Sequence, residues 1–299
     1  MIADRVPSQH RTFRMTLAYD GTAYAGWQVQ PRKQTVQGML EKAIAQVCHQ
    51  RVRVTGSGRT DSGVHAIGQV ATFSLVDWKA GADALARALT SKLPADISIR
   101  EILDAPSDFH AIRDAVGKRY RYQIQVGGPR DAFAHRYHWH LSRPIDVDAM
   151  RQAASELCGR HDFASFQAAG SDRKTTTRHV RDLAIFDRLP NVDSGFAAKG
   201  ESVHDRSDAP SNASPIGGSG QGGSWLPGFR QLAIEIEADG FLYNMVRNIV
   251  GSLVEVGYGK RSPAWLAEVL EAKDRTVAGP TAPPHGLFLL WVAYAESTP

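Results

Sequence analysis

The chain has 299 residues, of which 42% are hydrophobic and 22% charged, and it carries a formal net charge of +4 with a sequence pI near 9.1. These values are ordinary for a protein with a packed core, and they exclude a fibrous or wholly disordered chain. No apolar run reaches the roughly eighteen residues of a membrane-spanning helix, and the stretch from Met1 to Arg14 lacks the apolar core of a signal peptide. We therefore expect a cytoplasmic protein with no membrane segment.

The first third of the chain alternates between strand and helix patterns. Apolar residues alternate with polar ones before an Asp-Gly turn, and Thr35 is a suitable N-cap for the helix that follows. The expected elements are a strand at 13–19, a helix from 36, strands at 51–55 and 67–75, a helix at 83–93 and a strand at 97–103. Their order is strand, helix, strand, strand, helix, strand.

A second series of the same kind follows. The expected elements are a strand at 118–126, a helix at 147–157, strands at 180–186 and 229–238, a helix at 241–256, another helix after Ser262 and a strand at 287–294. Two βαββαβ series predict an α+β fold of two ferredoxin-like halves, at 11–113 and 114–299, that share a largely antiparallel sheet flanked by helices. The segment at about 190–227 is rich in Gly and Ser and has no periodicity, so we predict a disordered insertion there.

The densest functional signal is the glycine-rich segment from Gly56 to Gly63, which contains one carboxylate, Asp61. A phosphate-binding P-loop is disfavoured because the Lys-Ser/Thr pair that closes that motif is absent. Two readings of Asp61 stay open at this point. The carboxylate either caps a structural turn or acts as a nucleophile or a base.

Two further residues suit a site built around a carboxylate. Tyr120 lies on the apolar side of a strand whose other side is basic, so its ring either packs in the core or stacks on a nucleobase. Arg247 lies in an otherwise apolar helix, and a half-buried arginine needs an anion. Asp61 is a candidate for that anion.

Basic residues gather in two places, and RNA contact is favoured slightly over a solvated face for both. Arg119, on the basic side of the Tyr120 strand, is our candidate for a substrate-binding residue in the first cluster. The clusters are Arg113, Lys118, Arg119, Arg121 and Arg130, and then Arg173, Lys174, Arg178 and Arg181. The histidines His135, His138 and His140 lack a cysteine or acidic partner nearby, so we predict no metal site there.

The chain resembles the tRNA pseudouridine synthase A family at these residues and over most of its length, except for the first ten residues and 190–227. Seven stretches carry the resemblance, in the family's order. They are Tyr19-Asp20-Gly21-Thr22 with Gly26-Trp27-Gln28, Thr35-Val36-Gln37, Gly58 to Ala66 (GRTDSGVHA), Phe109-His110-Ala111, Lys118 to Tyr122 (KRYRY), Phe241 to Gly251 (FLYNMVRNIVG) and Gly279 to Leu287 (GPTAPPHGL).

The resemblance implies conversion of uridine to pseudouridine at positions 38, 39 and 40 in the anticodon stem-loop of tRNAs, in a central active-site cleft and without a cofactor. It makes Asp61 the essential aspartate, Tyr120 the base-stacking tyrosine and Arg247 the partner of Asp61. Arg59 would help to displace the target nucleotide, and Leu287 would line the pocket. It also implies a homodimer in which one tRNA contacts both subunits.

Two other classes of function are weighed against an isomerase. A non-catalytic RNA-binding protein could use the same ferredoxin-like halves, but a carboxylate such as Asp61 would repel the RNA backbone. A nucleotide-dependent enzyme would need the lysine that the glycine-rich segment lacks.

Overall fold

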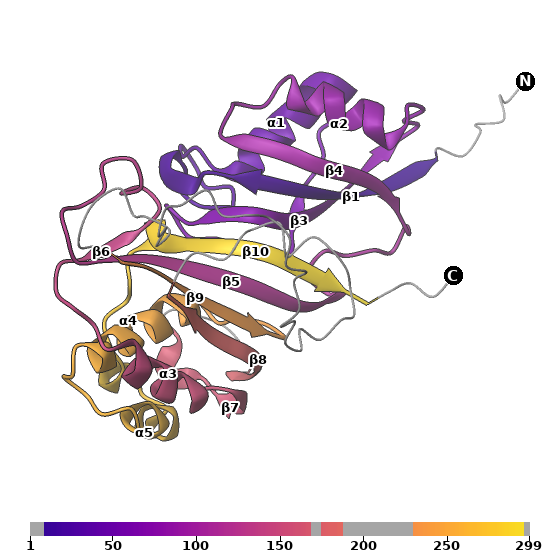
Figure 1. Ribbon diagram of the computed structural model, residues 1–299. Helices are drawn as coiled ribbons and strands as arrows, with labels where there is room; N and C mark the ends of the chain where they lie inside the picture. Colours follow the sequence, from indigo (N-terminus) through magenta and orange to yellow (C-terminus); the bar gives the residue numbers. More distant parts are fainter. Residues whose placement is uncertain (1–8, 169–174, 188–229, 296–299) are drawn as a thin grey trace, which may run out of the picture.

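One mixed, mostly antiparallel β-sheet extends through the computed structural model (Figure 1). The structure describes residues 9–168, 175–187 and 230–295, and the predicted insertion at 190–227 lies outside these ranges, as do Arg173 and Lys174. Within them the sheet has ten strands in the order β4-β1-β3-β10-β5-β9-β8-β7, with β2 paired to β3 and β6 to β5. The strands are β1 (His10–Tyr19), β2 (Thr55–Gly56), β3 (His65–Val76), β4 (Ile97–Ala105), β5 (Ala115–Val126), β6 (Trp139–Leu141), β7 (Gly159–Asp162), β8 (Thr177–Phe186), β9 (Arg230–Ala238) and β10 (Leu287–Tyr294).

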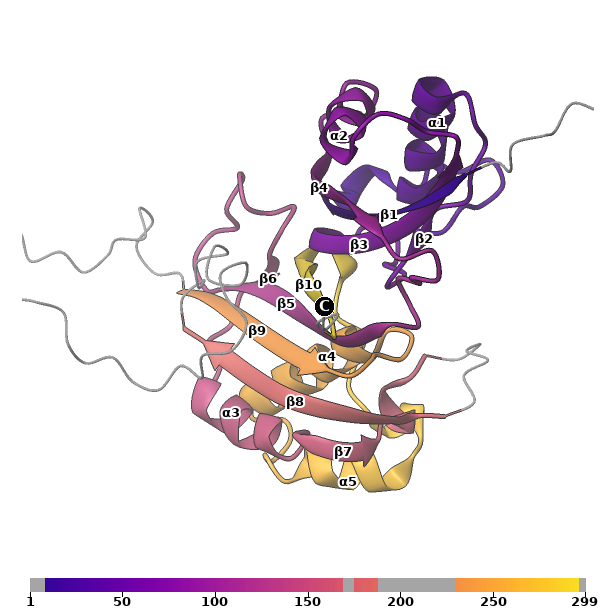
Figure 2. The same ribbon diagram turned by 90° about the vertical axis from the view of Figure 1, so that its right-hand side faces the viewer.

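The helices form two groups, one beside each half of the sheet (Figure 1, Figure 2). They are α1 (Val36–Cys48), α2 (Ala82–Thr90), α3 (Val147–Ser155), α4 (Met245–Gly257) and α5 (Trp265–Ala272), with short 3-10 helices η1 (Gly21–Ala23), η2 (Ala164–Phe166), η4 (Arg275–Val277) and η5 (Pro284–Gly286). The first two helices lie by β1, β3 and β4, and the other three lie by β5, β8 and β9. The α+β class expected from the sequence is confirmed. No helix among the described residues is long and apolar enough to cross a bilayer.

Several elements follow the sequence pattern closely. Thr35 caps α1 as expected, because its hydroxyl accepts a hydrogen bond from the Gly38 N–H at 3.3 Å. Helix α2 ends at Thr90, three residues before the predicted end at 93. A proline disfavours helical geometry in the residue before it, and Pro94 follows this last turn. The final strand, β10, has the predicted bounds.

Two elements differ most from their predicted bounds, and each difference has a local cause. The strand predicted at 51–55 is confined to β2, which starts at Thr55. Before it, the backbone N–H of Val54 donates to a side-chain oxygen of Glu41 at 3.0 Å instead of a strand neighbour. The helix predicted at 241–256 begins only at Met245, because Asn244 takes a left-handed conformation with φ 59°.

Strand β10 joins the two halves of the sheet although it comes last among the described strands. It pairs in parallel with the start of β3, where Phe288 faces His65 and Leu289 faces Ala66. On its other side it pairs antiparallel with β5 along nearly its whole length. The seam between the halves therefore runs beside the segment that contains Asp61.

Candidate active site

The segment from Gly56 to Gly63 is a tight turn between β2 and β3, held from several sides. The Gln69 side chain donates to the Gly58 carbonyl at 2.6 Å and accepts from the Gly58 N–H at 3.3 Å. The Thr60 hydroxyl lies 2.7 Å from the Tyr19 hydroxyl, and the Thr60 carbonyl accepts from the Trp27 N–H at 2.9 Å. These bonds leave Asp61 on a backbone with little freedom to move.

Gly63 completes this turn and is required there on two grounds. Its φ of +79° is a left-handed value that residues with a Cβ rarely adopt. A Cβ added at Gly63 would also lie 3.2 Å from the Pro284 side chain. The turn therefore fits closely against the segment that precedes β10.

Asp61 and Arg247 form an ion pair across the seam, as the sequence suggested. Arg247 Nη1 lies 3.3 Å from Asp61 Oδ2, and the two side chains are 15% and 28% exposed. Burial raises the pKa of the Asp61 carboxyl above its usual value, while the positive charge of Arg247 opposes that shift. A half-buried carboxylate held ionised by one cation can attack an electrophile or remove a proton.

Arg247 is itself fixed by the segment before β10. Its Nε donates to the Ala282 carbonyl at 2.7 Å, and its Nη1 also donates to the Asn244 side chain at 3.1 Å. The Ala282 N–H in turn donates to the Arg247 carbonyl at 3.1 Å. The start of α4 and the segment at 279–284 therefore both orient this guanidinium toward Asp61.

Tyr120 lies on β5, buried and beside the glycine-rich turn. Its side chain is 7% exposed, and its ring meets the Phe241 ring edge-on at 4.9 Å between centroids. The hydroxyl lies 3.4 Å from the position that a Cβ on Gly58 would occupy. Burial raises the pKa of the phenol, and the nearby Tyr19 and Asp61 raise it further, so the hydroxyl stays protonated at neutral pH.

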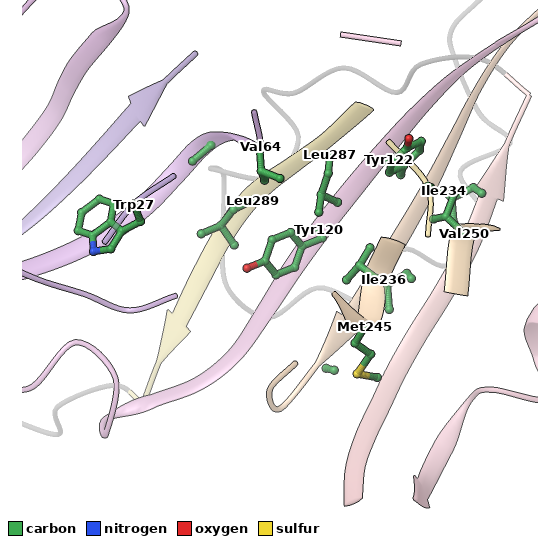
Figure 3. Close-up of a cluster of buried hydrophobic side chains, with 14 of the residues drawn as sticks. Trp27, Val64, Tyr120, Tyr122, Ile234, Ile236, Met245, Val250, Leu287 and Leu289 are labelled. Atoms are coloured by element: carbon green, nitrogen blue, oxygen red, sulfur yellow. The ribbon is translucent and has the colours of Figure 1, made fainter. Parts of the chain in front are cut away.

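Leu287 lies at the start of β10, where it pairs with Tyr122 and contributes to the same apolar cluster as Tyr120 (Figure 3). The side chain is buried. In this view Leu287, Val64 and Leu289 are drawn around one side of the Tyr120 ring. The site therefore has an apolar wall next to its ion pair.

The other two predicted site residues have different surroundings. Arg59 is exposed on the turn, two residues from Asp61. Arg119 points to the opposite face of β5 from Tyr120, because neighbouring residues of a strand alternate. There its guanidinium contacts Glu235 at 2.6 Å, Asp182 at 2.8 Å and Glu237 at 3.2 Å. The structure does not bring Arg119 together with Asp61.

Much of the first basic cluster is likewise occupied by protein groups. Arg121 is buried and contacts Glu235 at 2.6 Å. Lys118 donates to the Ser57 carbonyl at 2.6 Å, and Arg113 is bound to Asp114 and to the Asp108 carbonyl. Arg130 is exposed. Side chains that appear as a basic stripe in the sequence are thus partly neutralised on folding.

His65 is a site residue to which the sequence alone assigned no role. It is buried directly behind the turn, with Nδ1 3.0 Å from both the Gly21 N–H nitrogen and Asp20 Oδ1. Its Nε2 lies 3.1 Å from the His285 carbonyl oxygen. The available signal was its place in the motif Gly58 to Ala66, but the motif does not reveal these partners from distant segments.

The three histidines considered for a metal bind backbone carbonyls. His135 lies 2.7 Å from the Ala132 carbonyl, His138 lies 3.2 Å from that of Ala134, and His140 lies 3.1 Å from that of Gly128. Across residues 9–168, 175–187 and 230–295, no three His, Cys, Asp or Glu side chains converge as metal ligands would.

Sequence comparison with known proteins identifies the family of this chain. The sequence matches the family described as tRNA pseudouridine synthase over residues 15–112 and 153–295. The chain belongs to this family. It is 38% identical to tRNA pseudouridine synthase A of Myxococcus xanthus over 96% of this chain and 93% of the relative. It is 40% identical to the synthase of the same name from Halalkalibacterium halodurans, over 91% and 89% of the two chains, and to that of a Thermoanaerobacter species, over 95% and 100%. As a member of the tRNA pseudouridine synthases it is an isomerase.

Proposed function

We propose that this enzyme isomerises uridine to pseudouridine at positions 38, 39 and 40 in the anticodon stem-loop of tRNAs. Membership of the family supports the reaction, and the resemblance described above supports the three positions. The observation that carries the proposal is the Asp61–Arg247 pair, a half-buried carboxylate beside a buried tyrosine at the seam of the sheet.

The fold that frames this site is, in our proposal, two ferredoxin-like halves, at 11–113 and 114–299. The strand order supports it. In the first half the order is β4-β1-β3 with β2 on β3, that is, fourth, first, third and second strand. The second half repeats this order as β10-β5-β9-β8 when the short strands β6 and β7 are not counted. The active-site cleft would then lie centrally, between the helices of one half and those of the other.

The reaction needs one glycosidic bond to break and another to form. The bond between C1′ and N1 breaks with its electron pair on N1, the uracil turns, and C5 bonds to C1′ while the C5 proton is lost and N1 gains a proton. No atom is added overall and nothing is oxidised, so we propose that no cofactor is required. The target base must first leave its stack, which costs a few kcal/mol.

Asp61 can serve this reaction in two ways. As a nucleophile, its carboxylate attacks C1′ as N1 leaves, and C5 later displaces it. As a base, it removes the C2′ proton while the C1′–N1 bond breaks, which leaves a C1′=C2′ double bond until C5 adds and C2′ is reprotonated. Arg247 keeps the carboxylate ionised in either route.

The remaining residues have binding roles in the proposal. Tyr120 stacks on the flipped base, and Leu287 lines the apolar wall of its pocket. Arg59 is exposed on the turn, which suits a side chain that displaces the target nucleotide. Arg119 contacts the tRNA, and the tRNA competes for its guanidinium with Glu235, Asp182 and Glu237. We further propose a homodimer in which one tRNA contacts both subunits.

Replacement of the carboxylate tests the proposal most directly. Asp61→Asn should lower pseudouridine formation in unmodified tRNA by at least about 100-fold, while tRNA still binds. Asp148→Asn is a matched control, because that carboxylate is largely exposed on α3. Pseudouridine mapping by position also checks the three sites. Substantial turnover by Asp61→Asn, or modification at other positions only, would contradict the proposal.

An isotope experiment separates the two roles of Asp61. We would prepare tRNA with deuterium at C2′ of the target uridine and measure the single-turnover rate and the deuterium content of the product. The base route gives a slower reaction, whereas the nucleophile route leaves the rate unchanged and retains all the deuterium.

A further inference from the structure

The loop between β5 and β6 presents an aromatic ring to solvent. Phe133 is 94% exposed, whereas no other large exposed apolar side chain within the described ranges exceeds 49%. Exposure of a whole phenylalanine ring costs free energy that burial in a contact would recover. The ring is therefore free to make a contact with a ligand.

The loop holds this ring in a defined position. Asp131 Oδ1 accepts from the Phe133 N–H at 2.7 Å and from the Ala134 N–H at 3.1 Å. The buried Gln125 side chain accepts from the Asp131 N–H at 3.0 Å and donates to the Pro129 carbonyl at 2.7 Å. These bonds fix the backbone on both sides of the ring, so ordering the loop costs little when a ligand binds.

The same loop is attached to the back of the catalytic turn. The Tyr137 hydroxyl donates to Asp20 Oδ2 at 2.9 Å, and the Tyr137 ring meets the His65 ring edge-on at 5.2 Å between centroids. His65 begins β3 directly after the turn, and β5 ends at the same edge of the sheet (Figure 1). A macromolecule that reaches Asp61 can therefore also reach this loop.

The charges around the ring favour a nucleic acid over a second protein surface. Arg130 and Arg136 lie three residues before and three residues after Phe133 in the sequence, and both are exposed. The one carboxylate between them, Asp131, is occupied by the backbone N–H groups of the loop. An aromatic ring between cations is the combination that binds unpaired bases, because the ring stacks on a base while the cations contact phosphates.

We propose that Phe133 stacks on an unpaired base of the tRNA outside the catalytic pocket, with Arg130 and Arg136 on the adjoining phosphates. The contact rests on the proposed function, because it assumes that the substrate at Asp61 is an RNA with unpaired bases. The contact stabilises the bound substrate and the transition state equally, so its loss should weaken tRNA binding without changing the rate at saturating tRNA.

Phe133→Ala tests this proposal, with Phe133→Trp and Phe186→Ala as controls. We would measure the Kd of the full-length protein for unmodified tRNA, the rate of pseudouridine formation at saturating tRNA, and the molar mass in solution. Stacking of one base predicts a Kd increase of about tenfold in Phe133→Ala, at an unchanged saturated rate. Phe133→Trp should bind like the wild type, since an indole also stacks, and Phe186→Ala removes an exposed ring on β8 without effect.

Two outcomes would overturn the inference. One is a wild-type Kd in Phe133→Ala. The other is a lower molar mass together with weaker binding, which would make the loop a contact between protein subunits. If the wild-type enzyme binds tRNA but forms no pseudouridine, the proposed function fails, and the Kd values still decide the role of Phe133.

Discussion

At the scale of single residues, the protonation of Asp61 depends on a balance of two opposing effects. Burial disfavours the charged carboxylate, and Arg247 favours it. The net shift is upward, so the carboxylate loses its charge at a higher pH than an exposed aspartate does. Since either proposed role needs the ionised form, activity should fall as the pH drops through this pKa.

Removal of the cation should move this pH dependence. In Arg247→Met the pKa of Asp61 rises further, so the acidic limb of the pH–rate profile shifts to higher pH and the rate at neutral pH falls. Arg247→Lys keeps a positive charge and should shift the limb less. Single-turnover rates of pseudouridine formation between about pH 5 and pH 8 measure both. A limb at the same pH in all three proteins would show that Arg247 does not control Asp61.

Arg119 gives a second prediction at this scale, because its two possible roles have different readouts. If it contacts substrate as proposed, Arg119→Ala weakens tRNA binding several-fold, and the slope of log Kd against log salt decreases. It should also destabilise the fold by about 3 kcal/mol, since Glu235 is buried and would lose one of its two arginine partners. Lower stability with unchanged binding and salt slope would assign Arg119 to the sheet alone.

The sequence anticipated one contact of the candidate site better than the surroundings of its residues. The structure pairs Asp61 with Arg247, as residue type and position suggested, and it places Tyr120 beside the same turn. The partners of Arg119 were not predictable, because Asp182, Glu235 and Glu237 lie on other strands and only the sheet register places them beside it. The contacts of His65 could not be predicted for the same reason. Its bonds reach Gly21 and His285, which are far away in the sequence.

At the scale of elements, α4 and the segment at 279–284 act as one support for Arg247. A Cβ on Gly251 would lie 1.7 Å from the Pro280 carbonyl oxygen, so only glycine permits this approach. At the next residue of the helix, the Ser252 hydroxyl accepts from the Gly279 N–H at 2.9 Å. The segment that carries the Ala282 carbonyl is therefore held against the helix at two points.

Gly251→Ala should disrupt this support. The added methyl group forces the segment away from α4, which should lower the free energy of unfolding by about 3 kcal/mol and reduce kcat by loosening Arg247. Urea unfolding and single-turnover rates measure the two effects. Gly81→Ala is a suitable control, because no atom lies within 4 Å of the added Cβ. Equal behaviour of the two variants would contradict this role of Gly251.

Element types were predictable from periodicity, whereas some bounds depended on contacts that periodicity does not register. The alternation in β1 and β5 and the stripe in α1 are local, and those elements formed as expected. The residues at 51–54 have a strand-like composition, but side chains take the place of strand partners here. The Glu41 side chain accepts from the Val54 N–H, and the Gln50 side chain accepts from the Val76 N–H at the end of β3. Strands β6 and β7 escaped prediction, since three or four residues are too few to establish a period.

At the scale of the whole molecule, two buried histidines and one partly buried histidine connect the halves of the sheet and the loop that carries Phe133. His65 reaches the His285 carbonyl, and His285 reaches the His138 carbonyl at 3.1 Å. Burial lowers the pKa of all three rings below the usual value for histidine. The unfolded chain therefore takes up protons at a higher pH than the folded protein does.

This difference predicts a stability that declines in mild acid. The free energy of unfolding should be at its full value above about pH 6.5 and fall as the pH decreases toward 5, because the unfolded state binds more protons. His65→Ala should make this decline less steep and should lower stability at neutral pH by about 2 kcal/mol. His135→Ala, on the exposed part of the loop, should change neither. Thermal or urea unfolding across this pH range is the measurement, and an unaltered slope in His65→Ala would contradict the prediction.

The central position of β10 has a consequence for the synthesis of the protein. Nearly all of the described chain leaves the ribosome before residues 287–294 do, so β3 and β5 emerge without the strand that pairs with both. Long-range pairing of this kind forms slowly, and open strand edges can recruit other chains in the meantime. The Asp61–Arg247 pair spans this seam, so we expect it to form only once β10 is in place. A chain that stops before residue 287 should therefore form no pseudouridine.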